Sequence, residues 1–321
     1  MSGNGEFDLI ARHFAPLVTS PGARGLRDDA AVLDAGTWVV SVDCIVEGVH
    51  FLSDDPIDRV AQKALRVNLS DIAAKGAAPL HYVLALQWPD HRPVAQLEAF
   101  AAGLARDQQT FGCDLIGGDT TATSGPLAVS ITVFGRPCGP RTPARADARP
   151  GDDLWVTGAI GDGVLGLASR RGELPGLSAV DHAYLVDRYQ TPTPRTSFAP
   201  TIARFAHAAM DVSDGLLADA GKIAAASDVR VVIEPRKTPL SSAARAWLSS
   251  QPEKDRALER LLNGGDDYEI LFSARRSARA ALLATGADRG LSITRIGMVT
   301  GGAGLDAGGL AVGGHVHRLG A

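Results

Sequence analysis

Cysteine and aromatic residues are scarce in this chain, and basic residues are not in excess. Of 321 residues only 3 are cysteine, and Cys44, Cys113 and Cys138 lie far apart, which fits neither a disulfide framework nor a zinc site. The formal net charge of −4 argues against a general attraction to nucleic acid or anionic lipid. No apolar run approaches the length of a membrane span, and the N-terminus lacks a basic region followed by an apolar stretch. We therefore expect a cytoplasmic protein with no membrane and no nucleic-acid partner.

Several motifs of common enzyme classes are also missing. The sequence has no H-E-x-x-H zinc signature and no G-x-S-x-G nucleophile elbow. Its closest approach to a Walker A loop, Gly215 to Ile223, has one residue too many and Ile where Ser or Thr should bind the metal. These absences argue against a zinc protease, a serine hydrolase of that type and a P-loop nucleotidase.

The chain does contain enough apolar residues for large cores, since 45% of it is hydrophobic, and its length favours two domains. Predicted strands cover residues 38–42, 82–87, 127–134, 153–157, 229–233 and 268–272. Predicted helices cover 56–75, 94–111, 181–189, 214–226 and 241–248, and another starts over 164–169. This alternation is typical of an α/β or α+β protein. The Pro-, Arg- and Gly-rich segment 136–151 predicts an inter-domain connection, so we expect domains 1–147 and 148–321.

Aspartates fall at expected strand ends, at turns or beside glycine. The set comprises Asp28, Asp29, Asp43, Asp71, Asp119, Asp211 and Asp214. Each one alone is explained as well by helix capping or a turn. If several converge, two carboxylates at roughly 4 Å repel by about 4 kcal/mol at an effective dielectric of 20, so such a cluster needs cations. Oxygen ligands with water in the remaining positions favour Mg²⁺ shared with substrate phosphates.

A second glycine-rich motif, Gly161-x-Gly163-x-x-Gly166, follows a predicted strand and opens a predicted helix. The pattern matches the dinucleotide fingerprint, but the acidic Asp162 inside the turn would oppose a bare pyrophosphate. A tight glycine turn that packs the helix on the strand explains the motif better.

Nine ordered motifs together resemble the thiamine-monophosphate kinase family, which belongs to the superfamily of aminoimidazole ribonucleotide synthetase. The matching stretches are Gly5 to Ile10, Asp28 to Leu33, Ser41 to Phe51, Lys63 to Ala74, Gly117 to Thr121, Pro150 to Asp152, Val156 to Gly158, Met210 to Leu216 and Gly264 to Glu269. The resemblance extends from residue 5 to about residue 300, which makes it far more specific than any single motif.

The resemblance implies ATP-dependent phosphorylation of thiamine monophosphate to thiamine diphosphate, by direct in-line transfer with several Mg²⁺ ions. It implies a two-domain fold, with an N-terminal mixed sheet with helices that binds ATP and Mg²⁺ and forms a homodimer, and a C-terminal α/β domain. The metal ligands would be Asp29, Ser41, Val42, Asp43, Asp71, Asp119, Asp211 and Asp214. ATP would contact Gly118, Asp119, Arg145 and Ser213, and thiamine monophosphate would contact His50, Asp266 and His315.

Some positions depart from the family pattern. Arg27 replaces the usual Gly, Val42 replaces Thr and can offer a metal only its backbone, and Asp266 replaces the longer Glu. His315 stands where the family often has an aromatic residue. The reaction needs positioning and charge neutralisation more than a strong base, so we assign no general base. The alternatives are another ATP-dependent enzyme of the superfamily, such as aminoimidazole ribonucleotide synthetase, and a non-catalytic nucleotide-binding protein.

Overall fold

The computed structural model describes residues 10–19 and 36–314 and divides the chain into two compact units. Unit 1 consists of residues up to Ile72 together with Ala77–Pro137. Unit 2 consists of Ala73–Gly76 and the chain from Cys138 onward. Residues 138–147 thus belong to unit 2, and the expected domain boundary after residue 147 stays a prediction. No helix in the described ranges is long and apolar enough to cross a membrane.

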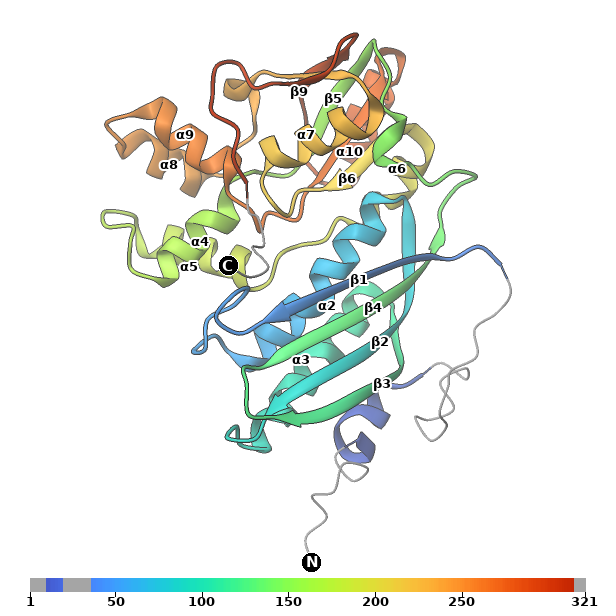
Figure 1. Ribbon diagram of the computed structural model, residues 1–321, viewed down its shortest axis with the longest axis vertical. Helices are drawn as coiled ribbons and strands as arrows, with labels where there is room; N and C mark the ends of the chain where they lie inside the picture. The colour runs from blue at the N-terminus through green and yellow to red at the C-terminus, as the bar shows by residue number, and fades with distance from the viewer. Residues whose placement is uncertain (1–9, 20–35, 315–321) are drawn as a thin grey trace, which may run out of the picture. The chain divides into compact units, whose positions relative to one another are not determined.

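Unit 1 contains a four-stranded mixed sheet in the order β1-β4-β2-β3 (Figure 1). Its strands are β1 (Val39–Val46), β2 (Ala77–Pro89), β3 (Asp114–Thr123) and β4 (Ala128–Pro137). β4 pairs antiparallel with β1 and with β2, whereas β2 and β3 run parallel. The edge strands of this sheet are therefore β1 and β3.

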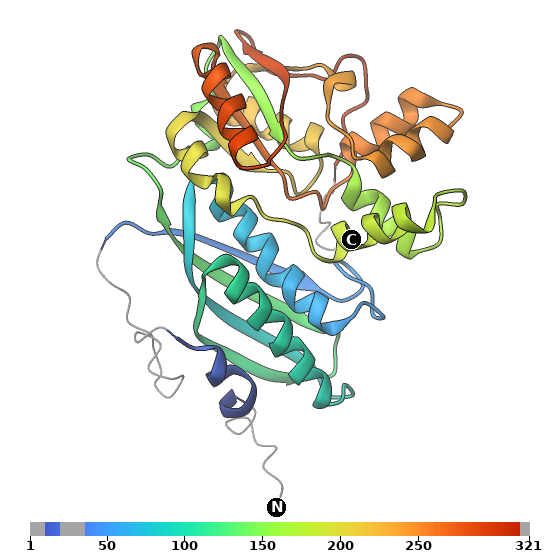
Figure 2. The same ribbon diagram turned by 180° about the vertical axis from the view of Figure 1, so that it is seen from behind.

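Two long helices cover one face of this sheet, α2 (Ile57–Ala74) and α3 (Ala95–Phe111), as Figure 2 shows. Leu65 and Leu69 of α2 and Phe100 of α3 are fully buried. Short helical turns η1 (Ile10–Phe14) and η2 (Ala15–Leu17) precede them. Over the opposite face, within the described part of unit 1, no helix or strand is placed, and Val40 and Val42 of β1 are 53% and 60% exposed. We call this side of the sheet the open face.

Unit 2 contains a six-stranded mixed sheet in the order β10-β7-β9-β5-β8-β6. Its strands are β5 (Asp152–Thr157), β6 (Ala206–Asp211), β7 (Arg230–Ile233), β8 (Ile270–Arg275), β9 (Ile293–Thr300) and β10 (Gly304–Asp306). Only β10 and β7 are parallel, and every other neighbouring pair is antiparallel. Every residue of β5 is buried, as expected of a central strand covered on both sides.

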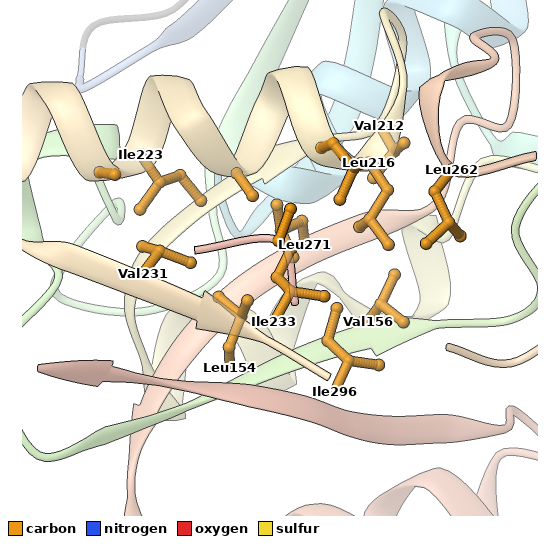
Figure 3. Packing of buried hydrophobic residues seen from close by; sticks show 14 of the residues in the cluster. Leu154, Val156, Val212, Leu216, Ile223, Val231, Ile233, Leu262, Leu271 and Ile296 are labelled. Atoms are coloured by element: carbon orange, nitrogen blue, oxygen red, sulfur yellow. The ribbon is translucent and has the colours of Figure 1, made fainter. Parts of the chain in front are cut away.

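Helices pack on both faces of the second sheet. Leu216 and Ile223 of α7 (Leu216–Ser227) pack against Leu154, Val231 and Leu271 of the strands (Figure 3). On the other face Phe198 and Ile202, before and in α6 (Ala199–Phe205), and Leu282 of α10 (Arg279–Asp288) bury Trp155 and Phe272. A third cluster joins α4 (Asp162–Arg170), α5 (Ala179–Gln190), α8 (Ser242–Ser250) and α9 (Lys254–Asn263).

The two-domain mixed architecture confirms the expected fold class, with corrections at element ends. Asp43 does not end its strand, because β1 continues in register with β4 to Val46. Asp214 does not lie in a helix, because Gly215, with φ of +116°, precedes the first residue of α7. Likewise β8 begins at Ile270 rather than at Tyr268, whose positive φ is incompatible with a strand. Residues 114–123, which carried no strand prediction, form β3.

Candidate functional site

In unit 1, Ser41 and Asp43 of β1 lie against α2. Because side chains alternate along a strand, these two share the face that the helices cover. The Ser41 hydroxyl donates to Asp71 Oδ2 over 2.5 Å, and the Asp43 backbone N–H donates to Asn68 Oδ1 over 2.9 Å. Asn68 and Asp71 are three residues apart and so lie on one side of the helix. The structure therefore brings three of the predicted metal ligands, Ser41, Asp43 and Asp71, to one place.

His50 lies in the turn that follows β1. Its Nδ1 accepts the Val46 backbone N–H over 3.0 Å, which places the proton of a neutral imidazole on Nε2. The His50 carbonyl accepts from the ammonium of Lys63, a side chain that is almost completely buried, over 2.9 Å. The predicted substrate-binding histidine is thus fixed in orientation by its own turn and by α2.

Gly118 and Asp119 lie on β3, at the other edge of the sheet. Asp119 pairs with Ala85 of β2, Ala85 with Ser130 of β4, and Ser130 with Cys44 of β1, so Asp119 shares the open face with Cys44 and Val42. Three strand spacings separate the two edges, about 14 Å. Within one copy of unit 1, Asp119 is therefore not next to Ser41 and Asp71. A Cβ at Gly118 would lie 2.0 Å from the Leu84 carbonyl oxygen, so close strand packing alone requires glycine there.

In unit 2, Asp211 ends β6, and Ser213 and Asp214 lie in the turn between β6 and α7. The buried carboxylate of Asp219 accepts the backbone N–H groups of Ser213 and Asp214 over 3.0 and 3.1 Å. Burial raises the pKa of Asp219, and the hydrogen bond from Lys222 opposes this shift. Lys222 also donates to Asp214. The first turns of α7 thus hold the predicted ATP and metal residues in a defined conformation.

The segment 264–269 runs alongside this turn. The Asp266 N–H donates to the Ser213 carbonyl over 2.9 Å, and the Tyr268 N–H donates to the Val212 carbonyl over 2.8 Å. The Val212 N–H in turn donates to the Glu269 carbonyl over 2.8 Å. The predicted substrate residue Asp266 is therefore a direct neighbour of Ser213, although 53 positions separate them in the chain.

The glycine-rich start of α4 faces the same segment. Asp267 Oδ2 accepts the Gly161 N–H over 2.8 Å, and Oδ1 accepts the Gly163 N–H over 3.0 Å. Burial raises the pKa of Asp267 well above its ordinary value, although both backbone hydrogen bonds oppose the shift. The amides that a dinucleotide pyrophosphate would need are occupied by a side chain of the protein, as expected for a structural glycine turn.

A buried ion cluster anchors the end of this segment. Glu269, fully buried, accepts from Arg195, from Arg188 over 3.2 Å and from the Thr157 hydroxyl over 2.7 Å. Burial alone would lower the pKa of Arg195, but the charge of Glu269 and the hydrogen bonds to it together outweigh burial and raise that pKa. Arg188 also donates to the Asp267 carbonyl over 3.2 Å. The cluster ties α5 and its following loop to the backbone of the 264–269 segment.

Of the remaining predicted side-chain contacts, Arg145 lies within the described ranges, and Asp29 and His315 do not. Arg145 is exposed in the short turn η4 (Arg145–Asp147), whose carbonyl at Arg145 accepts from Ser227 Oγ over 2.7 Å. Asp29 and His315, and with them Arg27, lie outside the described residues. Gly314, the last described residue, lies close to Asp214 and Ala218, since a Cβ there would be 3.1 Å from the Asp214 carbonyl oxygen.

The oxygen donors present fit Mg²⁺ in type. In the two described ranges, no group of three or more His, Cys, Asp or Glu side chains could hold a metal ion by itself. Mg²⁺, however, is commonly held by one or two carboxylates, with phosphate oxygens and water as the other ligands. Asp71 with Ser41 in unit 1, and Asp211 with Asp214 in unit 2, offer sets of that kind.

The comparisons with known proteins agree with this architecture. The family described as AIR synthase related protein, N-terminal domain, matches residues 27–136, and its C-terminal domain matches residues 149–308. A thiamine-monophosphate kinase from Caulobacter vibrioides is 44% identical over 306 residues, covering 94% of this chain and 86% of that relative. Among solved structures, thiamine-monophosphate kinase from Stenotrophomonas maltophilia K279a has a TM-score of 0.80 at 38% identity, covering 89% of this chain and 90% of the other.

The name of a further solved structure states which ligands were bound. The protein described as AaThiL complexed with AMPPCP and TMP has a TM-score of 0.78 at 30% identity, and 86% of each chain is covered. On these findings the chain is a member of the AIR synthase related proteins, the class that its two matched domains define. Within that class it belongs to the thiamine-monophosphate kinase family.

Several residues that shape the site carried no sequence prediction. These are Arg188, Arg195, Asp219, Lys222, Asp267, Tyr268 and Glu269. Asp267, Tyr268 and Glu269 stand inside a motif that the resemblance quoted, so their place in the chain was a signal. For Arg188 and Arg195 the sequence offers none, because only the folded chain brings them to Glu269.

Proposed function

We propose that the residues described above serve the reaction of the thiamine-monophosphate kinases. Membership of that family makes the chain a phosphotransferase that uses ATP to phosphorylate thiamine monophosphate to thiamine diphosphate. The observation that carries the residue assignment is the pairing of the 264–269 segment with residues 212–213. It sets a predicted acceptor residue, Asp266, beside a predicted ATP residue, Ser213.

In this proposal, different residues bind thiamine monophosphate and ATP. His50 and Asp266 bind thiamine monophosphate, with His315 of the terminal segment as a further contact. Gly118, Asp119, Arg145 and Ser213 contact ATP. Because the attacking phosphate oxygen is already an anion at neutral pH, the protein has to hold two anions in line rather than remove a proton. Oriented side chains such as His50, fixed by the Val46 N–H, suit that task.

We propose that several Mg²⁺ ions are held, in unit 1 by Ser41, Asp43 and Asp71 and in unit 2 by Asp211 and Asp214, with Asp29, Asp119 and the Val42 backbone as further ligands. Mg²⁺ bound to these oxygen donors would supply charge neutralisation for the phosphates of the substrates. Ser41 keeps the Asp71 carboxylate turned toward β1, which prepares that oxygen donor before any ion arrives. In unit 2, Lys222 donates to Asp214 and thus supplies a positive charge near this carboxylate.

We also propose a homodimer in the cytoplasm, in which the open faces of the first sheets meet. The support for the dimer is the exposure of Val40 and Val42, since apolar side chains on a sheet face are typical of an interface. The support for the location is the composition, which has few cysteines and no excess of basic residues.

The test is direct. The purified protein is incubated with MgATP and thiamine monophosphate, and thiamine diphosphate is detected by fluorescence after oxidation to thiochrome, with ADP measured in parallel. Equal amounts of both products are expected, and omission of Mg²⁺ should stop the reaction. ADP without thiamine diphosphate would contradict the assigned acceptor, and nucleotide binding without any product would favour a non-catalytic protein.

A further inference from the structure

The segment 264–269 contains two residues in a backbone conformation that L-amino acids rarely adopt. Asp266 has a φ of +67°, and Tyr268 has a φ of +52°. Aspartate tolerates this region, whereas a bulky aromatic residue there is a true exception that its surroundings must enforce. Such residues gather where a binding or reacting group has to be held in place.

In this conformation, the side chain of Tyr268 reaches back to Asp266. Its hydroxyl donates to Asp266 Oδ1 over 3.1 Å, across a separation of only two residues. Tyr268 is 8% exposed, so its ring is held by packing and the hydroxyl has little freedom to move. The carboxylate of Asp266 is therefore oriented by a fixed neighbour within its own segment.

Asp267, between these two residues, fixes the backbone itself. Its buried carboxylate accepts the amides of Gly161, directly before α4, and of Gly163, in the first turn of α4, and its carbonyl accepts from Arg188. A Cβ at Gly163 would lie 2.5 Å from the Asp266 carbonyl carbon. The start of α4 is therefore shaped to the backbone of Asp266, which a simple helix cap would not require.

We propose that Asp267 and the Tyr268 hydroxyl are positioning residues that hold the Asp266 carboxylate in the orientation that thiamine monophosphate requires. This inference rests on the proposed function. Asp267 sets the path of the backbone, and Tyr268 sets the direction of the side chain. Neither residue needs to contact the substrate.

Two conservative substitutions test this proposal. Tyr268→Phe removes a single hydroxyl and leaves the ring. Asp267→Asn keeps the size, but its amide NH₂ would face one of the two backbone N–H groups that the carboxylate now accepts. Each change should raise the KM for thiamine monophosphate by about tenfold, the effect of losing one hydrogen bond to a charged group. The KM for ATP should change by less than about twofold.

The decisive readout is a double-mutant cycle with Asp266→Ala, with the Kd for thiamine monophosphate from calorimetry wherever turnover is slow. If Tyr268 and Asp267 act through Asp266, their substitutions have no further effect once that carboxylate is gone. Tyr184→Phe is the matched control, since it removes another tyrosine hydroxyl that donates to a carboxylate, that of Asp162. The control should leave the KM for thiamine monophosphate unchanged.

The outcomes separate the inference from the function on which it rests. The inference alone would be overturned if Tyr268→Phe and Asp267→Asn weakened thiamine monophosphate binding by the same factor with and without Asp266→Ala. It would also be overturned if they lowered the Tm but left the KM for thiamine monophosphate unchanged. If Asp267→Asn does not fold, the Tyr268→Phe cycle decides by itself. If the unaltered chain makes no thiamine diphosphate and does not bind thiamine monophosphate, the proposed function fails and the inference fails with it.

Discussion

The carboxylates of individual aspartates in this protein differ in the groups that donate hydrogen bonds to their oxygens. Asp219 and Asp267 each accept two backbone N–H groups in a buried environment, so they act as anchors for the backbone. Asp71 instead accepts a hydroxyl from Ser41 and is only half-buried. Aspartates that the sequence does not distinguish therefore divide into residues that anchor the backbone and candidate metal ligands. Substitution of each kind should affect stability and turnover differently.

Asp71→Asn should remove most turnover without loss of stability. Asparagine can still accept the Ser41 hydroxyl, but it supplies no charge for a cation. At saturating Mg²⁺ we expect turnover to fall by about 100-fold or more. The midpoint of urea unfolding without Mg²⁺ should stay the same.

Asp58→Asn is the matched control for this change. Asp58 lies in the same helix and pairs at the surface with Arg106. Its substitution should preserve both turnover and stability, because exposed pairs contribute little. Near-native turnover of Asp71→Asn would remove this residue from the proposed metal site.

Asp153 gives a pH-dependent prediction at the same scale. Burial alone would raise its pKa, but the hydrogen bonds and the positive charges of Arg279 and Arg295 together outweigh burial and hold the pKa below its ordinary value of 3.8. Such a carboxyl stabilises the fold fully above its unfolded pKa, and the contribution is lost as pH falls through the folded value. Asp153→Asn should thus lower the urea midpoint at neutral pH, and the gap to the unaltered protein should close below pH 3.8.

An exposed ion pair serves as the control for the buried Asp153. Asp255 contacts Arg236 with 70% of its side chain exposed. Asp255→Asn should change the urea midpoint little at any pH. A gap for Asp153→Asn that stayed constant down to acid pH would show that Arg279 and Arg295 do not lower its pKa.

At the scale of elements, the start of α4 is defined by close backbone contacts rather than by helix propensity. Gly161 and Gly163 give their amides to Asp267, and Gly163 lies against the Asp266 backbone. Helix propensity alone would favour alanine at a helical position. The contact with the 264–269 segment decides against it.

Gly163→Ala is therefore expected to be harmful, and Gly221→Ala in α7 to be beneficial. Around Gly221 nothing lies within 4 Å of a built Cβ, so alanine should stabilise the protein by about 0.5–1 kcal/mol. At Gly163 the added methyl would displace the Asp266 backbone, which should lower the Tm and raise the KM for thiamine monophosphate. A stabilised Gly163→Ala variant with an unchanged KM would contradict the close contact.

At the scale of the whole molecule, the apolar side chains exposed on the open face of unit 1 have no explanation if the protein is a monomer. Val40 and Val42 stand on an edge strand with more than half of each side chain exposed. Apolar side chains exposed together on a sheet face are a typical surface for association with another chain. A second copy of this chain would cover it.

Val42→Glu should convert the proposed dimer to a monomer, because a buried unpaired carboxylate is costly. Light scattering after size-exclusion chromatography gives the mass directly. Val180→Glu is the control, since Val180 on α5 is 78% exposed. A monomeric unaltered protein, or a Val42→Glu variant that remains dimeric, would exclude this interface.

The sequence by itself determined the elements that carry a strong local pattern and the set of motifs. Apolar residues at helical spacing predicted α2 and α3, short runs of β-branched, aromatic or apolar residues predicted β1 and β2, and alternation predicted β4. The nine motifs were sufficient to indicate the family. β3 was not predicted because its sequence, Asp114–Thr123, contains two glycines and only three apolar residues. Such a strand gains its order from backbone pairing with β2, which no local pattern encodes.

Only the tertiary structure decided which of the predicted residues are neighbours. It joined Asp266 to Ser213 and assigned Asp267 to the glycine turn. It also set Asp119 on the opposite edge and the opposite face of the sheet from Asp43. The physical reason is that strand register and loop pairing are fixed by contacts between segments far apart in the chain. A shift of one residue turns every side chain of a strand to the other face, and the sequence motifs would look the same.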